Sequence, residues 1–186
     1  MHLLSLVSVL GAATLATCQS DPAKGPVTGK LGDAPVVTTS AVGDTWVATF
    51  DGSQAGIKGT VTAVGSKTGI DYTLDFASLP TAQGPFGYHV HAKALPVGGT
   101  CADTGAHLDT YGRGQDPVCD AANPQRCEVG DLSGKFGKVE GPAAKKTFND
   151  PYSAVDQAVP GYIGELAIVF HNSTAARVAC ANLVKV

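Results

Sequence analysis

Two histidines, His89 and His91, stand two positions apart in FGYHVHAK, residues 86–93, a run otherwise typical of a buried strand. Side chains at positions i and i+2 of a strand lie on one face, so both imidazoles point the same way. Neutral imidazole is a common metal ligand, which makes the pair a candidate metal site. The pair alone is also compatible with two packed histidines that each make one hydrogen bond.

Two further histidines could complete such a site. His107 follows Cys101 in a segment without alternation, and His171 ends an apolar run nine residues before Cys180. If Cys101 bonds to Cys180, that link closes a loop of about 80 residues, worth ~4 kcal/mol in the chain-entropy model, and holds both histidines near the pair. Four nitrogens without a thiolate match the tetragonal preference of Cu(II) better than a structural zinc site.

Two other uses of a His-x-His pair fit less well. A cupin needs a glutamate shortly after the second histidine, and the following AKALPVGG has none. A zinc site like that of carbonic anhydrase uses three histidines and leaves the fourth unexplained.

Short strands are expected to position these residues. β-branched and aromatic runs separated by Gly- or Asp-bearing turns fill most of the chain from residue 45 onward. Residues 98–130 lack alternation and contain three of the cysteines, which predicts a long loop tied down covalently. The pattern predicts an all-β fold, a Greek-key antiparallel β-barrel or sandwich.

Composition limits the function and suggests three regions. A net charge of −3 over 186 residues argues against a nucleic-acid binder. Residues 1–18 are apolar and uncharged apart from His2, which predicts a secretory signal peptide too short to span a membrane. Residues 19–40 are expected to be a flexible linker, and residues 41–186 the folded domain.

The cysteine count agrees with secretion. We expect cleavage near Ala16 or Cys18, and removal of Cys18 leaves four cysteines. An even number in an oxidising compartment predicts two disulfides, for which three pairings are possible.

Five segments resemble, in order, the superoxide dismutases of the copper-zinc fold, as secreted copper-only members of fungal type. They are GYHVHAK, CADTGAHLD, CEVGDLSGK, IVFH and RVACANL, and the likeness covers about residue 45 to the C-terminus. The resemblance implies a copper ion held by four ligands, with Arg177 beside its open face. It implies a Cys101–Cys180 disulfide, which leaves Cys119 and Cys127 to pair with each other. The implied ligands are His89, His91, His107 and His171.

Two departures from the copper-zinc pattern belong together in copper-only members. Asp131 keeps the zinc-site aspartate, but Glu128 stands where a zinc histidine is expected. We therefore expect one copper and no zinc. The connection from His171 to Arg177 is only NSTAA, where copper-zinc members insert a long charged loop. Copper should be open to solvent, and attraction of the anion should rest on Arg177 and the cupric charge.

The implied function is dismutation of superoxide to O2 and hydrogen peroxide by a secreted, extracellular or wall-associated monomer without a membrane span. One alternative is a non-catalytic copper-binding module on the same fold, and another is a copper-zinc enzyme with an unusual zinc site. No signal for a GPI anchor is expected before Val186.

Four residues near the expected site have roles that the sequence leaves to be tested. We hypothesise that Glu128 accepts a hydrogen bond from His107 and tunes its basicity. Asp131 could support a ligand in the same way or bond the backbone of its own turn. Arg177 could instead be a solvated residue at the rim of the barrel. Asn172 begins the N-glycosylation sequon NST directly after an expected ligand.

Overall fold

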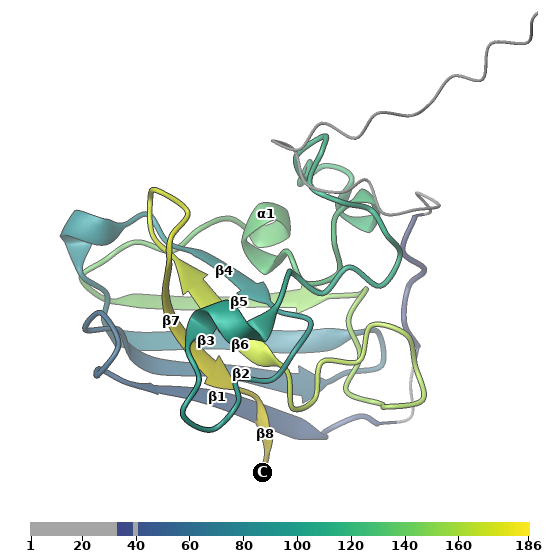
Figure 1. Ribbon diagram of the computed structural model, residues 1–186. Helices are drawn as coiled ribbons and strands as arrows, with labels where there is room; N and C mark the ends of the chain where they lie inside the picture. The colour runs from purple at the N-terminus through teal and green to yellow at the C-terminus, as the bar shows by residue number, and fades with distance from the viewer. Residues whose placement is uncertain (1–32, 39–40) are drawn as a thin grey trace, which may run out of the picture.

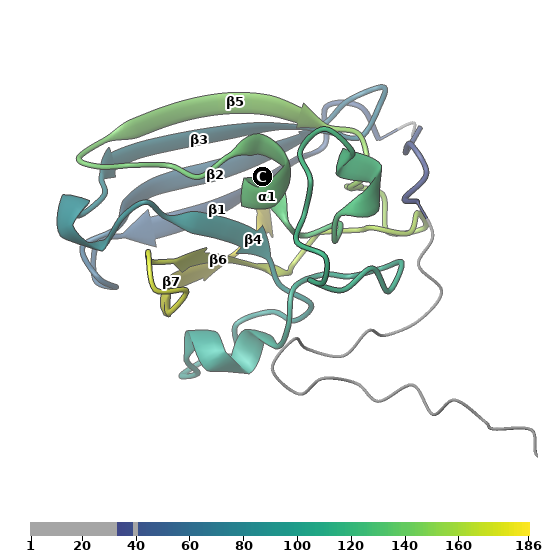
Figure 2. The ribbon, with the colours of Figure 1, turned by 90° about the horizontal axis from the view of Figure 1, so that it is seen from above.

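Two antiparallel β-sheets form the core of the computed structural model, which describes residues 33–38 and 41–186 (Figures 1 and 2). The larger sheet has the strand order β5-β3-β2-β1-β8 and the smaller has β4-β6-β7. The strands of the larger sheet are β1 (Thr45–Asp51), β2 (Lys58–Gly65), β3 (Ile70–Ser78), β5 (Ala144–Asp150) and β8 (Val184–Lys185). Those of the smaller sheet are β4 (Gly87–Val90), β6 (Ala167–His171) and β7 (Arg177–Asn182).

The predicted all-β class is confirmed, with the two sheets packed as a sandwich and not closed into one barrel. Strands β3 and β5 are neighbours although β4, between them in the chain, belongs to the other sheet. Such returns between layers are typical of Greek-key connections. Within the described residues, helical structure is limited to α1 (Leu132–Phe136) and the 3-10 turns η1 (Thr81–Gln83), η2 (Cys101–Thr104) and η3 (Pro124–Arg126). No helix of the described residues is long and apolar enough to cross a membrane.

An aromatic cluster joins the two sheets. The ring of Phe170 on β6 lies 4.9 Å from Phe76 and 5.2 Å from Phe50, both on the larger sheet, measured between centroids. Each such fully buried side chain contributes about 1.5–3 kcal/mol. Tyr88, the cross-strand partner of Phe170, packs in the same core. Because side chains alternate along a strand, His89 faces the opposite, outer side of the smaller sheet.

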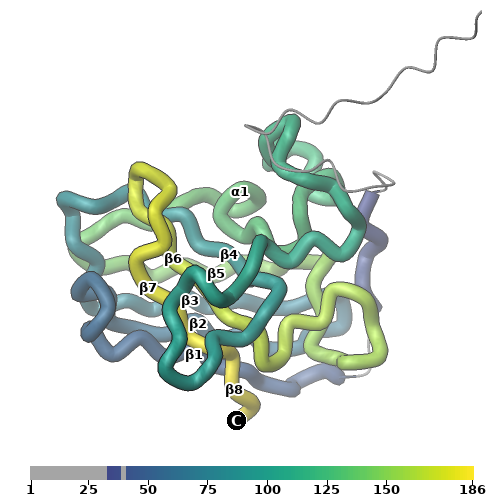
Figure 3. The backbone as a smooth tube through the Cα atoms, viewed as in Figure 1, coloured from purple at the N-terminus to yellow at the C-terminus, as the bar shows by residue number. Residues whose placement is uncertain are grey.

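The segment between β4 and α1 covers this outer side. Figure 3 shows it, in teal and green, crossing in front of the smaller sheet and then rising beside α1. Two disulfides fasten it, Cys101–Cys180 and Cys119–Cys127. These are the pairs that the resemblance implies. The expected long, covalently tied loop is therefore present, with only η2 and η3 as regular structure.

The N-terminal regions are described only in part. The expected signal peptide and residues 19–32 and 39–40 of the expected linker lie outside the described residues. Residues 33–38 pack on the domain: the backbone N–H of Ala34 donates to Gln125 and that of Val37 donates to Pro151. Both side chains are buried. This part of the expected linker is thus held against the domain.

Candidate metal centre

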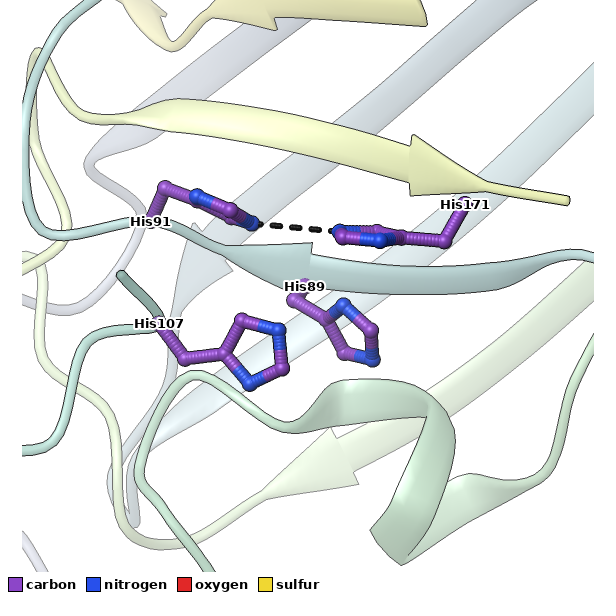
Figure 4. A group of neighbouring side chains, drawn as sticks. All are labelled: His89, His91, His107 and His171. Carbon is purple, nitrogen blue, oxygen red and sulfur yellow. Dashed lines mark hydrogen bonds between the residues drawn. The ribbon is translucent and has the colours of Figure 1, made fainter. Parts of the chain in front are cut away.

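The four expected histidines come together on the outer face of the smaller sheet (Figure 4). His89 lies on β4, His91 follows it, His171 ends β6, and His107 comes from the covering segment. One nitrogen from each ring can be chosen so that all four atoms lie within 4.8 Å of one another. No second group of His, Cys, Asp or Glu with this property is found in residues 33–38 and 41–186.

Backbone hydrogen bonds join the three segments around Val90, Leu108 and Gly130. The N–H of Leu108 donates to Val90, that of Val90 donates to Gly130, and that of Gly130 donates to Leu108. A Cβ atom at Gly130 would collide with the carbonyl oxygen of Val90, so the close approach requires glycine. The two expected ligands at 91 and 107 and the acids at 128 and 131 flank these three positions. The backbone therefore fixes the acids behind the histidines.

His91 and His171 present their Nε2 atoms to each other at 3.2 Å, the contact dashed in Figure 4. Nδ1 of His91 donates to the carbonyl of Gly105 (2.9 Å), and Nδ1 of His171 donates to that of Ala175 (3.1 Å). A carbonyl oxygen only accepts, so in the neutral rings the proton is on Nδ1 and both Nε2 atoms carry lone pairs. Two facing lone pairs repel each other unless a cation lies between them.

His89 leaves the opposite nitrogen free. Its Nε2 lies 3.0 Å from Oγ of Ser133 and 3.4 Å from a carboxylate oxygen of Asp131. Its Nδ1 is buried and has no hydrogen-bond partner among the described residues. Buried polar atoms without a partner are rare and costly. A metal ion in the cluster would satisfy this atom.

His107 is held from behind by an acid. Its Nδ1 lies 2.6 Å from Oε2 of Glu128, the contact expected from the sequence, and Gln115 approaches the same nitrogen at 3.2 Å. Both ring and carboxylate are largely buried. Nε2 of His107 remains for the cluster. The donor set is therefore Nδ1 of His89 and Nε2 of His91, His107 and His171, which fits a nitrogen-liganded metal such as copper.

Burial keeps three of the rings, those of His89, His91 and His171, in their neutral form. It lowers the pKa of His91 to about 3, with a further contribution from the nearby His107. Burial likewise lowers the pKa of His171 to about 4 and that of His89 below its usual value. Only the neutral imidazole can coordinate a metal, so the site is prepared for one at neutral pH.

Asp131 makes both of the contacts considered from the sequence. One carboxylate oxygen accepts the N–H of Gly134 at 2.7 Å and so caps the N-terminus of α1. The same oxygen faces Nε2 of His89. The carboxylate thus couples the start of the helix to a histidine of the cluster.

Arg177 lies at the edge of an open cavity of about 650 Å³ in front of the histidines. Its guanidinium donates to the carbonyls of Cys101 (2.9 Å), Ala102 (3.2 Å) and Gly105 (2.6 Å). The carbonyl of Gly105 also accepts from His91. Arg177 is therefore a fixed cation, and the Cys101–Cys180 disulfide holds the turn to which it binds.

The sequence did not reveal a buried ion pair behind the site. Nζ of Lys135 lies 2.8 Å from Asp150 and donates to the carbonyl of Val129 at 2.9 Å. Both side chains are fully buried, and Ser153 also donates to Asp150. The pair joins α1 to the end of β5 and holds the residue next to Glu128. No local pattern marks a lysine in SGK as buried, because its partner is fifteen residues away.

Similar proteins define the family. No family model matches the chain. The chain is 33% identical over 185 residues to a cell surface Cu-only superoxide dismutase of Arthroderma benhamiae, an alignment covering 83% of this chain and 50% of that protein. It is 36% identical over 154 residues to cell surface Cu-only superoxide dismutase 5 of Candida albicans, covering 82% and 66%.

A solved structure agrees. Candida albicans superoxide dismutase 5 with Cu(II) superposes with a TM-score of 0.70 at 34% identity, covering 78% of this chain and 94% of that one. The chain belongs to the family of fungal copper-only superoxide dismutases. It spans only 50% and 66% of the length of the two relatives above.

Proposed function

We propose that this chain is a copper-dependent superoxide dismutase that acts outside the cell or in the cell wall. The observation that carries the proposal is the set of four inward-facing ring nitrogens, one of them buried without a hydrogen-bond partner. Bound copper would supply the one-electron redox chemistry. Two superoxide anions and two protons then give one O2 and one hydrogen peroxide.

The residues of the chain have distinct tasks in this proposal. His89, His91, His107 and His171 would together hold the ion, each through one ring nitrogen. When Nε2 of His107 is not bound to the ion, it would carry a proton for the departing peroxide, and Glu128 orients that ring through Nδ1. Arg177 offers the anion a fixed positive charge beside the open cavity.

Zinc has no supported place in the proposal. The family pattern would put zinc on the far side of His107, where Nδ1 is instead in contact with Glu128. Asp131 is engaged with the helix terminus and His89. We propose one copper per chain and no zinc.

Metal analysis combined with an activity assay tests the function. Protein purified without added metal, then titrated with copper, should bind one equivalent and dismutate superoxide. Copper binding without turnover would favour the non-catalytic module. An equivalent of zinc in the purified protein would favour an unusual copper-zinc enzyme.

We further propose that residues 1–18 are removed on secretion, that the mature protein is a monomer, and that Asn172 is glycosylated. Asn172 lies in the exposed turn between β6 and β7, where its Oδ1 accepts from the backbone N–H and the hydroxyl of Thr174. The turn borders the cavity, so a glycan there would stand beside its mouth. N-terminal sequencing, light scattering and intact mass before and after glycosidase treatment test these three points.

A further inference from the structure

The open cavity has a charge balance opposite to that of the whole chain. The charged residues that line it are two cations, Lys138 and Arg177, and one acid, Asp131. The chain as a whole has 13 Lys and Arg against 16 Asp and Glu. A local positive excess therefore lies at the mouth of the site on a protein whose net charge repels anions.

The two cations differ in their freedom. Three hydrogen bonds to carbonyl oxygens hold the guanidinium of Arg177 in place. The side chain of Lys138 is exposed, and it forms no hydrogen bond or ion pair with any residue that the structure describes. A lysine ammonium on a flexible stem can follow an approaching anion, whereas the bound guanidinium cannot.

The backbone nevertheless keeps Lys138 close to the site. The residue before it, Gly137, ends α1, and its carbonyl accepts from the hydroxyl of Tyr88 at 2.9 Å. The residue after it, Val139, makes two backbone hydrogen bonds with Phe86, at 2.8 and 3.1 Å. Phe86 leads directly into β4, the strand that carries the histidine pair. The root of the lysine side chain is thus fixed relative to the metal centre.

We propose that Lys138 attracts small anions into the cavity and, with Arg177, replaces the charged loop that this chain lacks between β6 and β7. That connection has only five residues between His171 and Arg177, none of them charged. The identity of the anion as superoxide rests on the proposed function, but attraction of anions does not. At about 0.1 M salt the Debye length is roughly 10 Å, so an ammonium at the cavity edge acts over the final approach.

The test compares Lys138→Gln with the parent protein across ionic strength. At low salt, kcat/KM for superoxide should fall about two- to fivefold in Lys138→Gln and further in Lys138→Glu, with Lys138→Arg retaining most of it. The deficit should vanish near 1 M salt, where the Debye length is about 3 Å. Lys185→Gln removes the same charge from β8, at the opposite edge of the larger sheet from β5, and should leave kcat/KM unchanged.

Binding of azide to the copper-loaded protein, followed by optical titration, gives a readout independent of turnover. Lys138→Gln should weaken azide at low salt by a similar factor. A parent protein that binds azide in this salt-dependent way but does not dismutate superoxide would end the proposed function and leave the role of Lys138 standing. Equal kcat/KM and azide affinity in parent and Lys138→Gln, or a deficit that persists at high salt, would overturn the role of Lys138.

Discussion

Nδ1 of His107 and Oε2 of Glu128 lie 2.6 Å apart on the side of the ring that faces away from the other histidines. The carboxylate belongs to the backbone-paired segment that ends in the cap of α1, so its position does not depend on a bound ion. A carboxylate thus engages the ring nitrogen of His107 that a second, bridged metal would need.

This contact predicts a pH-dependent defect in Glu128→Gln. The carboxylate accepts from Nδ1 of His107 with a full negative charge, and an amide oxygen would accept more weakly. The ring that carries the proton is then oriented less firmly, and solvent supplies fewer protons as pH rises, so activity should fall mainly at alkaline pH while copper content stays at one equivalent. Dismutation rates across pH, measured beside copper content, check this. A pH profile unchanged from that of the parent would remove Glu128 from the mechanism.

Removing one imidazole should weaken copper binding and, with it, the stabilisation of the fold by copper. In His171→Ala, three nitrogens remain, and we expect copper affinity to fall by at least about tenfold and activity to be lost. A ligand stabilises the state that binds it. Copper should therefore raise the melting temperature of the parent protein, and it should raise that of His171→Ala much less. Calorimetry with and without copper measures both. Equal stabilisation of the two proteins would mean that His171 is not a ligand.

The Cys101–Cys180 disulfide should stabilise both the domain and the site. It joins residues 79 apart in the chain. The chain-entropy model puts such a link at about 4 kcal/mol. The double Cys101→Ser, Cys180→Ser variant should unfold at lower denaturant and bind copper more weakly, because the turn that bonds Arg177 and His91 is released. The Cys119→Ser, Cys127→Ser variant provides the comparison: it removes a disulfide that spans a separation of only 8, so a smaller loss is expected. Equal losses in the two variants would contradict the loop-length argument.

The Lys135–Asp150 pair predicts a large effect at a distance from the ligands. Both side chains are fully buried, so Lys135→Met leaves a buried carboxylate without its cation. Breaking such a pair on one side costs about 3–5 kcal/mol. Lys135→Met combined with Asp150→Leu should recover part of this loss, as measured by chemical denaturation. A single variant as stable as the parent would show that the pair contributes little.

How far the sequence predicts this molecule depends on the range of the contacts. The common face of His89 and His91 follows from the two-residue period of a strand and needs no tertiary information. The arrival of His107 and His171 beside them depends on pairing between distant segments, so the sequence could offer it only through a possible disulfide and a family resemblance. Residues 33–38 differ from the prediction for the same reason. Their composition predicts a linker, but their backbone forms hydrogen bonds with loops that are distant in the sequence.

The residues that support the histidines from behind can be predicted only in part from the sequence. Spacing from the zinc pattern singled out Glu128 and Asp131, and both face histidines of the cluster. Ser133 and Lys135 lie in the same short stretch, but their contacts with His89 and Asp150 appear only when α1 packs against β4 and the end of β5. No residue pattern within the chain encodes that packing.

Electron paramagnetic resonance of the protein loaded with one equivalent of Cu(II) tests the metal centre most directly. The structure predicts a tetragonal spectrum with nitrogen couplings from four imidazoles, and the loss of one coupling in His107→Gln. A spectrum dominated by oxygen or sulfur ligands, or one that His107→Gln leaves unaltered, would contradict the assignment.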